Sequence, residues 1–169
     1  MSERRAIAAI GLGSNLGDRE HMLARAITAL ERTSGVIVLR RSHWIETRPV
    51  GGPLGQGPFL NGAALIETTL APRALLEAML AIERHLGRER RERDGPRTID
   101  LDLLDYAGIS LEEAGLSLPH PRMGERHFVL EPLSQIAPDL WLVRHRTRVS
   151  ARLAELAREQ VDLAHGGLA

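Results

Sequence analysis

The chain has 169 residues and a mass of 18.6 kDa, and we expect residues 1–169 to form a single domain. Its 22 Lys and Arg residues balance its 22 Asp and Glu residues, so general attraction to nucleic acid or to a membrane surface is not expected. The absence of cysteine excludes disulfides and thiolate metal sites. No apolar run approaches the roughly 20 residues of a membrane span, and the start of the chain, MSERRAIAAIGLG, lacks the apolar region of a signal peptide, so a cytoplasmic protein is expected.

The N-terminal quarter is predicted to contain a strand, a helix and a second strand. Ala6–Ile10 is a short apolar run that ends at glycine, as is typical of a buried strand. Asp18 is a suitable N-cap for a helix through about Arg32, with an apolar stripe formed by Met22, Ala26, Ala29 and Leu30. The β-branched, partly alternating residues 36–47 predict one long strand with a solvated face.

Glycine and proline divide the middle of the chain. Residues 51–58 are predicted to form a mobile loop that includes Gly51 and Gly57, and residues 59–69 resume as a strand. Pro72 suits the first turn of a helix that ends before Gly87. A charged second loop follows, and Ile99–Tyr106 is the fourth strand.

This order of elements, β-α-β-β-α-β, predicts an α+β fold with a ferredoxin-like core. In that arrangement an antiparallel sheet carries helices on one face, and we expect the core to span about residues 5–142. The last third contains prolines at 119, 121, 132 and 138 and is predicted to be an irregular C-terminal extension. It ends in a helix over about residues 149–163.

The glycine-rich segment GLGSNLG, residues 11–17, does not match either common nucleotide-binding loop. The dinucleotide fingerprint requires glycine where the chain has Leu16, and the Gly-Lys-Ser/Thr of a Walker A loop is absent. We therefore interpret Gly11, Gly13 and Gly17 as a tight strand-to-helix turn, with capping by Ser14 and Asn15.

An acidic pair on the fourth strand is the most informative feature of the sequence. Side chains alternate between the two faces of a strand, so Asp100 and Asp102 share one face, with Cα atoms roughly 6.5–7 Å apart. Two adjacent carboxylates repel each other unless a cation lies between them, and oxygen ligands suit Mg²⁺. The structural alternative is the solvated face of an edge strand, but both flanking segments contain anion-binding residues.

Arginines precede the acidic strand, and a histidine with arginines follows it. Guanidinium groups match phosphate oxygens, and Arg97 lies nearest to the aspartates, after a Gly-Pro turn. For Arg90 and its neighbours a solvated loop is an equal alternative, because acidic residues nearly balance their charge. His120 stands between two prolines that restrict its backbone, and we leave open a structural or a phosphate-binding role.

The ends of the second and third predicted strands carry a hydroxyl, an aromatic ring and an amide, at Thr47, Phe59 and Asn61. These groups suit a flat heteroaromatic ligand. Phe59 and Phe128 are the only phenylalanines in the chain and are candidates for stacking platforms, although composition alone favours a place in the core.

Assembled in order, these segments resemble the 6-hydroxymethyl-7,8-dihydropterin pyrophosphokinase family of folate biosynthesis. The resemblance extends from about Ile7 to Leu140, and its RxGPRTIDLDLL block is highly specific. The matching segments are GSNLGD at 13–18, ETRPVG at 46–51, FLN at 59–61, LGRERRERDGPRTIDLDLL at 86–104, LPHPRM at 118–123, ERHFVLEPL at 125–133 and IAPDL at 136–140.

The resemblance implies transfer of the pyrophosphoryl group of ATP to the hydroxymethyl oxygen of the pterin, with release of AMP, by a monomer. It implies that Asp100 and Asp102 hold two Mg²⁺ ions and that these aspartates, with Arg88 and Arg97, form the catalytic set. The implied ATP contacts are Glu83, Arg88, Arg90, Arg97 and His120. The implied pterin contacts are Thr47, Val50, Phe59, Asn61, Arg126 and Phe128.

The chain departs from many relatives at Asp94, where they carry tryptophan just before the GPR turn, in a loop that closes over the active site. Arg93 still matches the family, but Asp94 puts in question how this loop closes. Two other functions stay in view. A catalytically inactive ferredoxin-like binding module would be expected to lose the aspartates or arginines, and a metal-dependent nuclease would be expected to have a basic surface.

Overall fold

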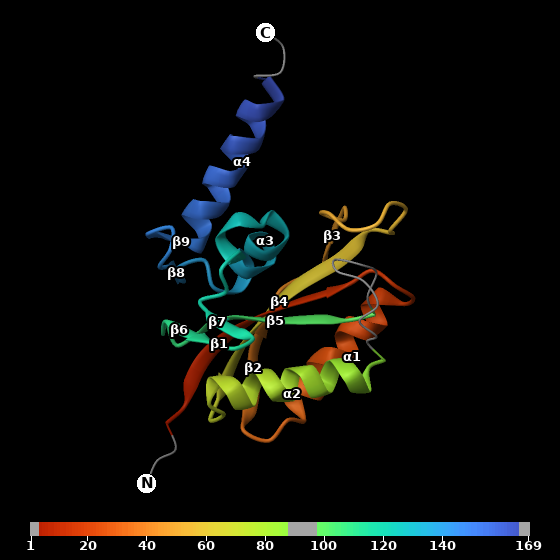
Figure 1. The fold of residues 1–169 in the computed structure, drawn as a ribbon, viewed down its shortest axis with the longest axis vertical. Coiled ribbons are helices and arrows are strands. Elements are labelled where there is room, and N and C mark those ends of the chain that lie inside the picture. Colours follow the sequence, from red (N-terminus) through yellow and green to blue (C-terminus); the bar gives the residue numbers. More distant parts are fainter. Residues whose placement is uncertain (1–3, 88–97, 166–169) are drawn as a thin grey trace.

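A computed structural model describes residues 4–87 and 98–165. Its centre is a five-stranded antiparallel sheet in the order β2-β4-β1-β5, with the short β3 also paired to β4 (Figure 1). This strand order confirms the predicted ferredoxin-like α+β fold. The sheet strands are β1 (Ala6–Ser14), β2 (Val36–Arg41), β3 (Ile45–Thr47), β4 (Phe59–Thr68) and β5 (Asp100–Tyr106).

The first strand is longer than predicted. Gly11, Gly13 and Ser14 belong to β1 and pair with β4, so the prediction of a turn with a Ser14 cap was wrong. Glycine is normally unfavourable in a strand, but here a Cβ at Gly13 would make a tight 3.1 Å contact with a side chain of β4. The turn is confined to residues 15–18, and Gly17 has a φ of +64°, which favours glycine.

Helix α1 (Arg19–Glu31) begins as predicted, with the Asp18 carboxylate accepting a hydrogen bond from the His21 N–H. Ala26 and Leu30 of the predicted apolar stripe are buried, whereas Met22 and Ala29 are only partly buried. The buried residues of the stripe are Leu23, Ala26, Ile27 and Leu30.

The predicted strand over residues 36–47 is two strands, β2 and β3, and the prediction of one continuous strand was wrong. The Ser42 hydroxyl donates to the His43 carbonyl and accepts from the Ala63 N–H. The Trp44 ring packs on Gly62, where an added Cβ would lie only 2.3 Å from it. This corner redirects the chain between β2 and β3, and leaves Thr47 paired with Phe59.

Helix α2 (Pro72–His85) and β5 form as predicted, with Gly87 at a φ of +83° after the helix. Alternation along β5 confirms that Leu101 and Leu103 are buried on one side, whereas Asp100 and Asp102 are half-buried on the other. The α1 and α2 face of the sheet holds the larger hydrophobic core, which includes Ile10, Leu23, Ile66, Met79 and Leu101.

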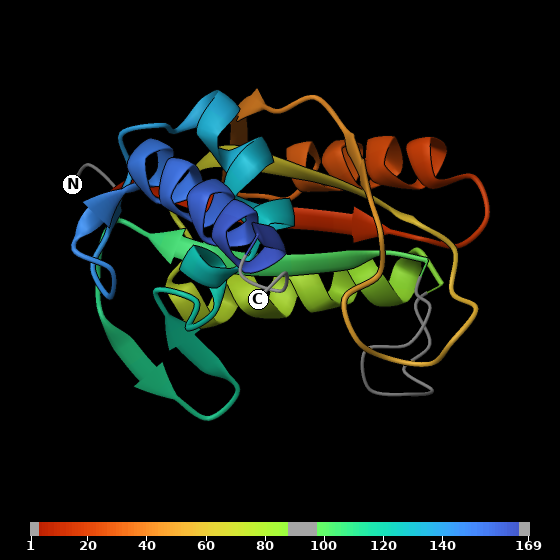
Figure 2. The same cartoon turned by 90° about the horizontal axis from the view of Figure 1, so that it is seen from above.

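Residues 123–165 lie over the opposite face of the sheet (Figures 1 and 2), whereas Leu116 and Leu118, which also follow β5, pack into the larger core. The region predicted to be irregular contains a buried helix, α3 (His127–Ile136), with Pro132 inside it. The prediction of irregular structure was wrong over these residues, because the apolar spacing of Val129, Leu130, Leu133 and Ile136 gives the helix one buried face despite the proline. The other elements here are β6 (Leu111–Glu113), β7 (Leu116–Leu118), the short 3-10 helix η1 (Met123–Glu125), β8 (Trp141–Leu142), β9 (Thr147–Arg148) and α4 (Val149–His165).

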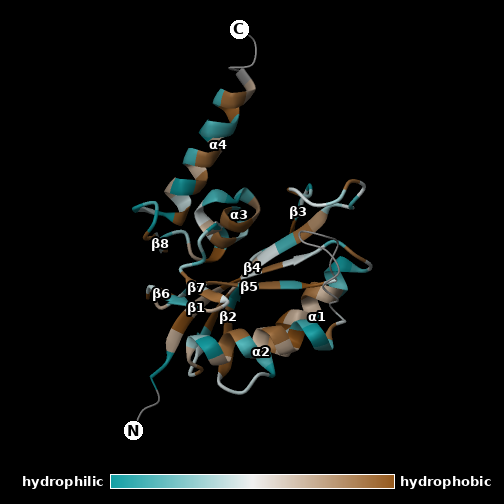
Figure 3. Cartoon of the chain, viewed as in Figure 1, coloured by the Kyte–Doolittle hydropathy of each residue, from teal (hydrophilic) through white to brown (hydrophobic). Residues whose placement is uncertain are grey.

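Helix α4 confirms the predicted C-terminal helix, and hydrophobic and hydrophilic residues alternate along it (Figure 3). Val149 and Leu156 join α3 and Leu104 in a second, smaller core. Among residues 4–87 and 98–165, no helix has the length and apolar character to cross a membrane.

Candidate active site

A cavity of about 220 Å³ lies on the α3 face of the sheet and brings together most of the predicted site residues that the structure describes. Its floor is the backbone of β1 and β4, and its sides come from β3, β5, α3 and the loop of residues 48–58. The lining residues are Gly11, Leu12, Gly13, Thr47, Arg48, Val50, Gly51, Phe59, Asn61, Gly62, Asp100, Asp102, Arg122, Arg126, Phe128 and Val129.

One wall of the cavity is formed by β3 and β4. Thr47 and Phe59 are direct partners across these strands, and Asn61 lies two residues further along β4. The Asn61 side-chain N–H donates to the Thr47 hydroxyl oxygen, and Asn61 is only 5% exposed. This bond orients the amide and leaves the Thr47 hydroxyl hydrogen able to donate elsewhere. The wall therefore presents a fixed set of donors and acceptors.

The part of the cavity floor that borders the space for a ligand is made of glycine. A Cβ added at Gly13 would lie 3.1 Å from the Asn61 Oδ1 and 3.8 Å from the Phe59 ring. The absence of a side chain at Gly13 thus gives the Asn61 amide its place in the wall.

Two aromatic rings reach the cavity, Phe59 from β4 and Phe128 from α3. The guanidinium carbon of Arg126 lies 5.6 Å from the centre of the Phe128 ring, a cation–π distance. One face of Phe128 is therefore taken by Arg126, and a flat ligand has the other face or the edge of the ring available to it.

The wall opposite Thr47 and Asn61 is the acidic one. Asp100 and Asp102 pair with Gly13 and Gly11 of β1 and both line the cavity. Because the partner residues are glycines, no β1 side chain stands between the carboxylates and the cavity. Arg122 and Arg126 line the same space, so the cavity holds both signs of charge.

His120 lies beside this charged region, outside the residues that line the cavity. Burial lowers the pKa of its imidazole, and the nearby Arg126 and Arg122 lower the pKa further, whereas Asp100 acts in the opposite direction. Its Nδ1 accepts the Arg122 N–H at 3.2 Å. Near neutral pH the ring is therefore uncharged, with its proton on Nε2.

Glu83 is not a cavity residue. It is 3% exposed, and its Oε1 accepts the Leu101 N–H at 2.8 Å. Leu101 stands between Asp100 and Asp102, so α2 holds the acidic strand through this bond. The predicted ATP contact of Glu83 stays a prediction.

The predicted residues Arg88, Arg90, Arg93, Asp94 and Arg97 lie outside the described residues. Arg122 lines the cavity but was not among the predicted site residues. The sequence did contain a signal for it, since it follows His120 by two positions in the same LPHPRM segment. Arg48 was also missed, because it stands in a loop with no periodic pattern.

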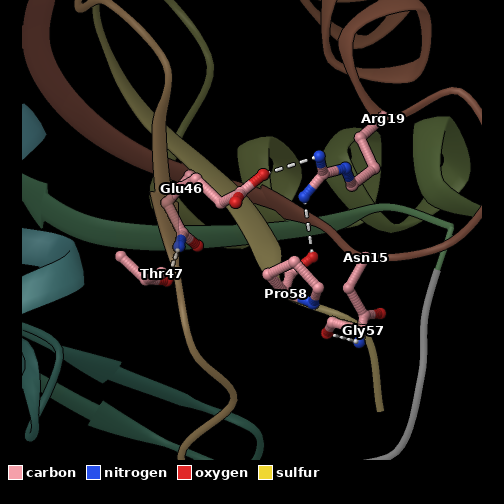
Figure 4. Close-up of polar contacts among 7 residues, drawn as sticks. Asn15, Arg19, Glu46, Thr47, Gly57 and Pro58 are labelled. Atoms are coloured by element: carbon pink, nitrogen blue, oxygen red, sulfur yellow. Dashed lines mark hydrogen bonds and ion pairs between the residues drawn. The ribbon is translucent and has the colours of Figure 1, made fainter.

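The loop of residues 48–58 is held at its end by the turn between β1 and α1 (Figure 4). The Asn15 side-chain N–H donates to the Gly57 carbonyl at 3.3 Å and to the Gln56 Oε1 at 3.2 Å. Arg19 donates to the Pro58 carbonyl at 2.9 Å and forms an ion pair with Glu46 at 2.8 Å. Val50 and Gly51, at the other end of the loop, form part of the cavity lining.

Comparison with known proteins gives a consistent result. The family model described as 7,8-dihydro-6-hydroxymethylpterin-pyrophosphokinase (HPPK) matches residues 9–138. A relative named 2-amino-4-hydroxy-6-hydroxymethyldihydropteridine pyrophosphokinase, from Methylorubrum extorquens, is 50% identical over 79% of this chain and 84% of its own length. A relative of the same name from Synechocystis sp. is 46% identical over 92% of this chain and 76% of its own length.

Solved structures agree at the level of the fold. The wild-type HPPK-DHPS of Plasmodium falciparum, crystallised with pterin and p-hydroxybenzoate, superposes with a TM-score of 0.75 at 13% identity, over 96% of this chain and 45% of that one. This chain thus corresponds to less than half of that longer protein. By sequence and by fold, the chain belongs to the 7,8-dihydro-6-hydroxymethylpterin-pyrophosphokinase family, the ATP-dependent diphosphotransferases of folate biosynthesis.

Proposed function

We propose that this chain binds 6-hydroxymethyl-7,8-dihydropterin in the cavity and transfers the pyrophosphoryl group of ATP to its hydroxymethyl oxygen. The observation that carries the proposal is that one cavity joins the Thr47–Asn61 pair and two phenylalanines to a pair of aspartates. The first group suits a flat heterocycle, and the second suits a metal-bound polyphosphate.

The pterin is assigned to the β3–β4 wall. Its ring would lie against Phe59 and the available side of Phe128, and the Thr47 hydroxyl and Asn61 amide would bind its polar edge. Arg126 lies against Phe128 and carries positive charge at the rim. Val50 brings the backbone of the 48–58 loop to the same cavity.

The aspartates fit Mg²⁺ as a cofactor that arrives with ATP. Among residues 4–87 and 98–165, no group of three or more His, Cys, Asp or Glu side chains is placed to hold a metal ion. Mg²⁺ is usually bound by one or two carboxylates together with substrate phosphates and water. Asp100 and Asp102 match that pattern, and the assignment of two ions rests on the family resemblance.

In the proposed reaction the pterin hydroxyl oxygen bonds to the β-phosphorus of ATP, and the bond from that phosphorus to the α–β bridging oxygen breaks. The hydroxyl loses its proton, and AMP leaves with the bridging oxygen. Bound Mg²⁺ would neutralise charge on the phosphate oxygens. Most of the remaining catalysis would be positioning and charge stabilisation, to which Arg122 and Arg126 of the cavity lining and the neutral His120 Nε2–H beside it would contribute.

The test is AMP release from ATP with Mg²⁺ and 6-hydroxymethyl-7,8-dihydropterin. We expect the wild-type chain to release AMP only when both metal and pterin are present. Asp100→Ala should lower the rate at least about 100-fold, a loss of about 2.7 kcal/mol in transition-state stabilisation. Asp139→Ala is the matched control, because Asp139 is an exposed carboxylate that pairs with Arg148 and is not part of the cavity.

Other results would contradict the proposal. Release of ADP in place of AMP would mean that a single phosphoryl group is transferred. Pterin binding without turnover would favour the inactive binding module. Cleavage of nucleic acid that requires Asp100 would favour a nuclease.

A further inference from the structure

We propose that Arg19 is a positioning residue that closes the base of the 48–58 loop and thereby sets the affinity for the pterin. This proposal rests on the proposed function, because it assigns the pterin to the wall that the loop completes. Arg19 does not line the cavity and is therefore not expected to contact the reacting groups. It acts on the cavity through the chain segments that do.

The geometry of the two Arg19 contacts carries the first step. One nitrogen, Nη1, donates to the carbonyl of Pro58, immediately before Phe59, and the other, Nη2, pairs with Glu46, immediately before Thr47. Thr47 and Phe59 are the paired residues at which the loop leaves the sheet. A single guanidinium therefore joins the two chain segments at the base of the loop (Figure 4).

Arg19 makes these contacts from behind the binding wall. Side chains alternate along a strand, so Glu46 points to the opposite face of β3 from Thr47. Arg19 is the first residue of α1, which packs on that opposite face. The guanidinium thus supports the wall without occupying ligand space.

The position of Arg19 within α1 gives an independent reason to assign it this role. A cation in the first turn of a helix interacts unfavourably with the helix dipole, and the capping of α1 is already provided by Asp18. Helix formation therefore does not explain why an arginine occupies this position. A planar guanidinium can bind two acceptors at a fixed separation, which is what Arg19 does here.

The 48–58 loop has few features of its own that would hold it in place. It contains Gly51, Gly52 and Gly55, all with positive φ, and Leu54 at its tip is fully exposed at 102%. None of residues 48–58 is buried, so the loop's own packing contributes little to holding Val50 and Gly51 at the cavity. If the fraction of molecules with the loop in its binding position falls, the apparent pterin affinity falls by the same factor.

The experiment compares Arg19→Met, Arg19→Lys and Glu46→Gln with the wild type. We expect Arg19→Met to raise the KM for pterin about 10-fold, with the KM for ATP unchanged within about 2-fold. Glu46→Gln should raise the pterin KM less, because the Arg19 bond to Pro58 survives. Arg19→Lys should recover part of the loss, since an ammonium can bind one of the two acceptors but lacks the fork.

Arg73→Met is the matched control. Arg73 also stands at the start of a helix, and it also binds a carboxylate and a carbonyl, Glu113 at 3.0 Å and Ala114 at 2.7 Å. Neither of these lies at the cavity. We expect this variant to keep both KM values.

Hydrogen–deuterium exchange of residues 48–58 supplies a second measurement that does not depend on turnover. Arg19→Met should speed exchange there and leave residues 111–118 as in the wild type. The proposal is overturned if Arg19→Met keeps the wild-type pterin KM, raises both KM values equally, or exchanges as the wild type does. If Arg19→Met does not fold, Glu46→Gln decides on the same criteria. A wild-type chain that releases no AMP would instead refute the proposed function.

Discussion

The two walls of the cavity are built in different ways. The β3–β4 wall is joined within itself, through strand pairing and the Asn61–Thr47 hydrogen bond. The β5 wall places two like charges on one face of one strand, and Arg122 and Arg126 line the same cavity. The first wall is organised by hydrogen bonds of fixed direction, and the second by charges that a bound cation and polyphosphate would balance.

Each wall is nevertheless supported from the α1 and α2 face of the sheet by a charged helix residue. Arg19 of α1 binds the base of the β3–β4 wall, and Glu83 of α2 binds the Leu101 N–H in the middle of the β5 wall. The helices that pack in the larger core therefore position both walls through residues that do not themselves line the cavity. The predictions below separate ligand contact from such support.

Asn61→Ala tests ligand contact at the β3–β4 wall, and it is expected to have the largest effect on pterin affinity. This change removes a buried amide and leaves the Thr47 hydroxyl without its donor, so pterin affinity should fall about 10- to 100-fold, or about 1.4–2.8 kcal/mol. ATP binding should not change. Calorimetric titration with each ligand measures both affinities, and Thr33→Val, a hydroxyl deletion at the end of α1, is the control. Equal losses for both ligands would show that the walls are not independent.

Glu83→Ala tests support of the acidic wall. It leaves the buried Leu101 N–H without this acceptor, so the free energy of unfolding in urea should fall by about 1–3 kcal/mol. Glu83→Gln should keep most of the stability, because an amide oxygen also accepts a hydrogen bond. If Glu83→Gln folds normally but raises the KM for ATP, the predicted nucleotide contact is correct and support is not its main role.

The smallest effect is expected for Asp105→Asn, on the same strand. Burial raises the Asp105 pKa above its ordinary 3.8, opposed by the Gly108 N–H. The native state therefore binds this proton more tightly than the unfolded state does, and wild-type stability is lost as pH rises from about 4 through the raised pKa. Asn keeps the acceptor and abolishes this titration. The stability of the variant relative to wild type should rise over that pH range and then level off; a constant difference would contradict the assignment.

Much of the acidic wall could be predicted from the sequence, because strand alternation needs only local information. The period of two in residues 99–103 placed Asp100 and Asp102 on one face and the leucines on the other, as observed. The Asp18 cap and the Gly87 terminus were predictable for the same reason, since each depends on the chemistry of one turn.

Features that depend on contacts distant in sequence were not predictable in this way. Gly13 resembles a turn glycine in the sequence, and the reason for it is Asn61, 48 positions later, whose Oδ1 would lie only 3.1 Å from a Cβ at Gly13. Arg19 and Glu83 act on segments 27 and 18 residues away, respectively. Helix α3 was not predicted for another reason: the four prolines of this region favour irregular structure, although one of them, Pro132, lies inside the helix.

The glycine floor has a consequence for how this protein tolerates change. Glycine within a strand reduces stability by roughly 0.5–1 kcal/mol relative to alanine, and β1 carries two such residues, Gly11 and Gly13, opposite the aspartates. The neighbours of Gly11 leave ordinary contact distance for a Cβ, 3.5 Å from Leu104, so its backbone could bear a larger residue. Selection for thermal stability alone would therefore favour a side chain at Gly11, whereas selection for ligand binding would keep glycine there, and the two pressures oppose each other at one position of the strand.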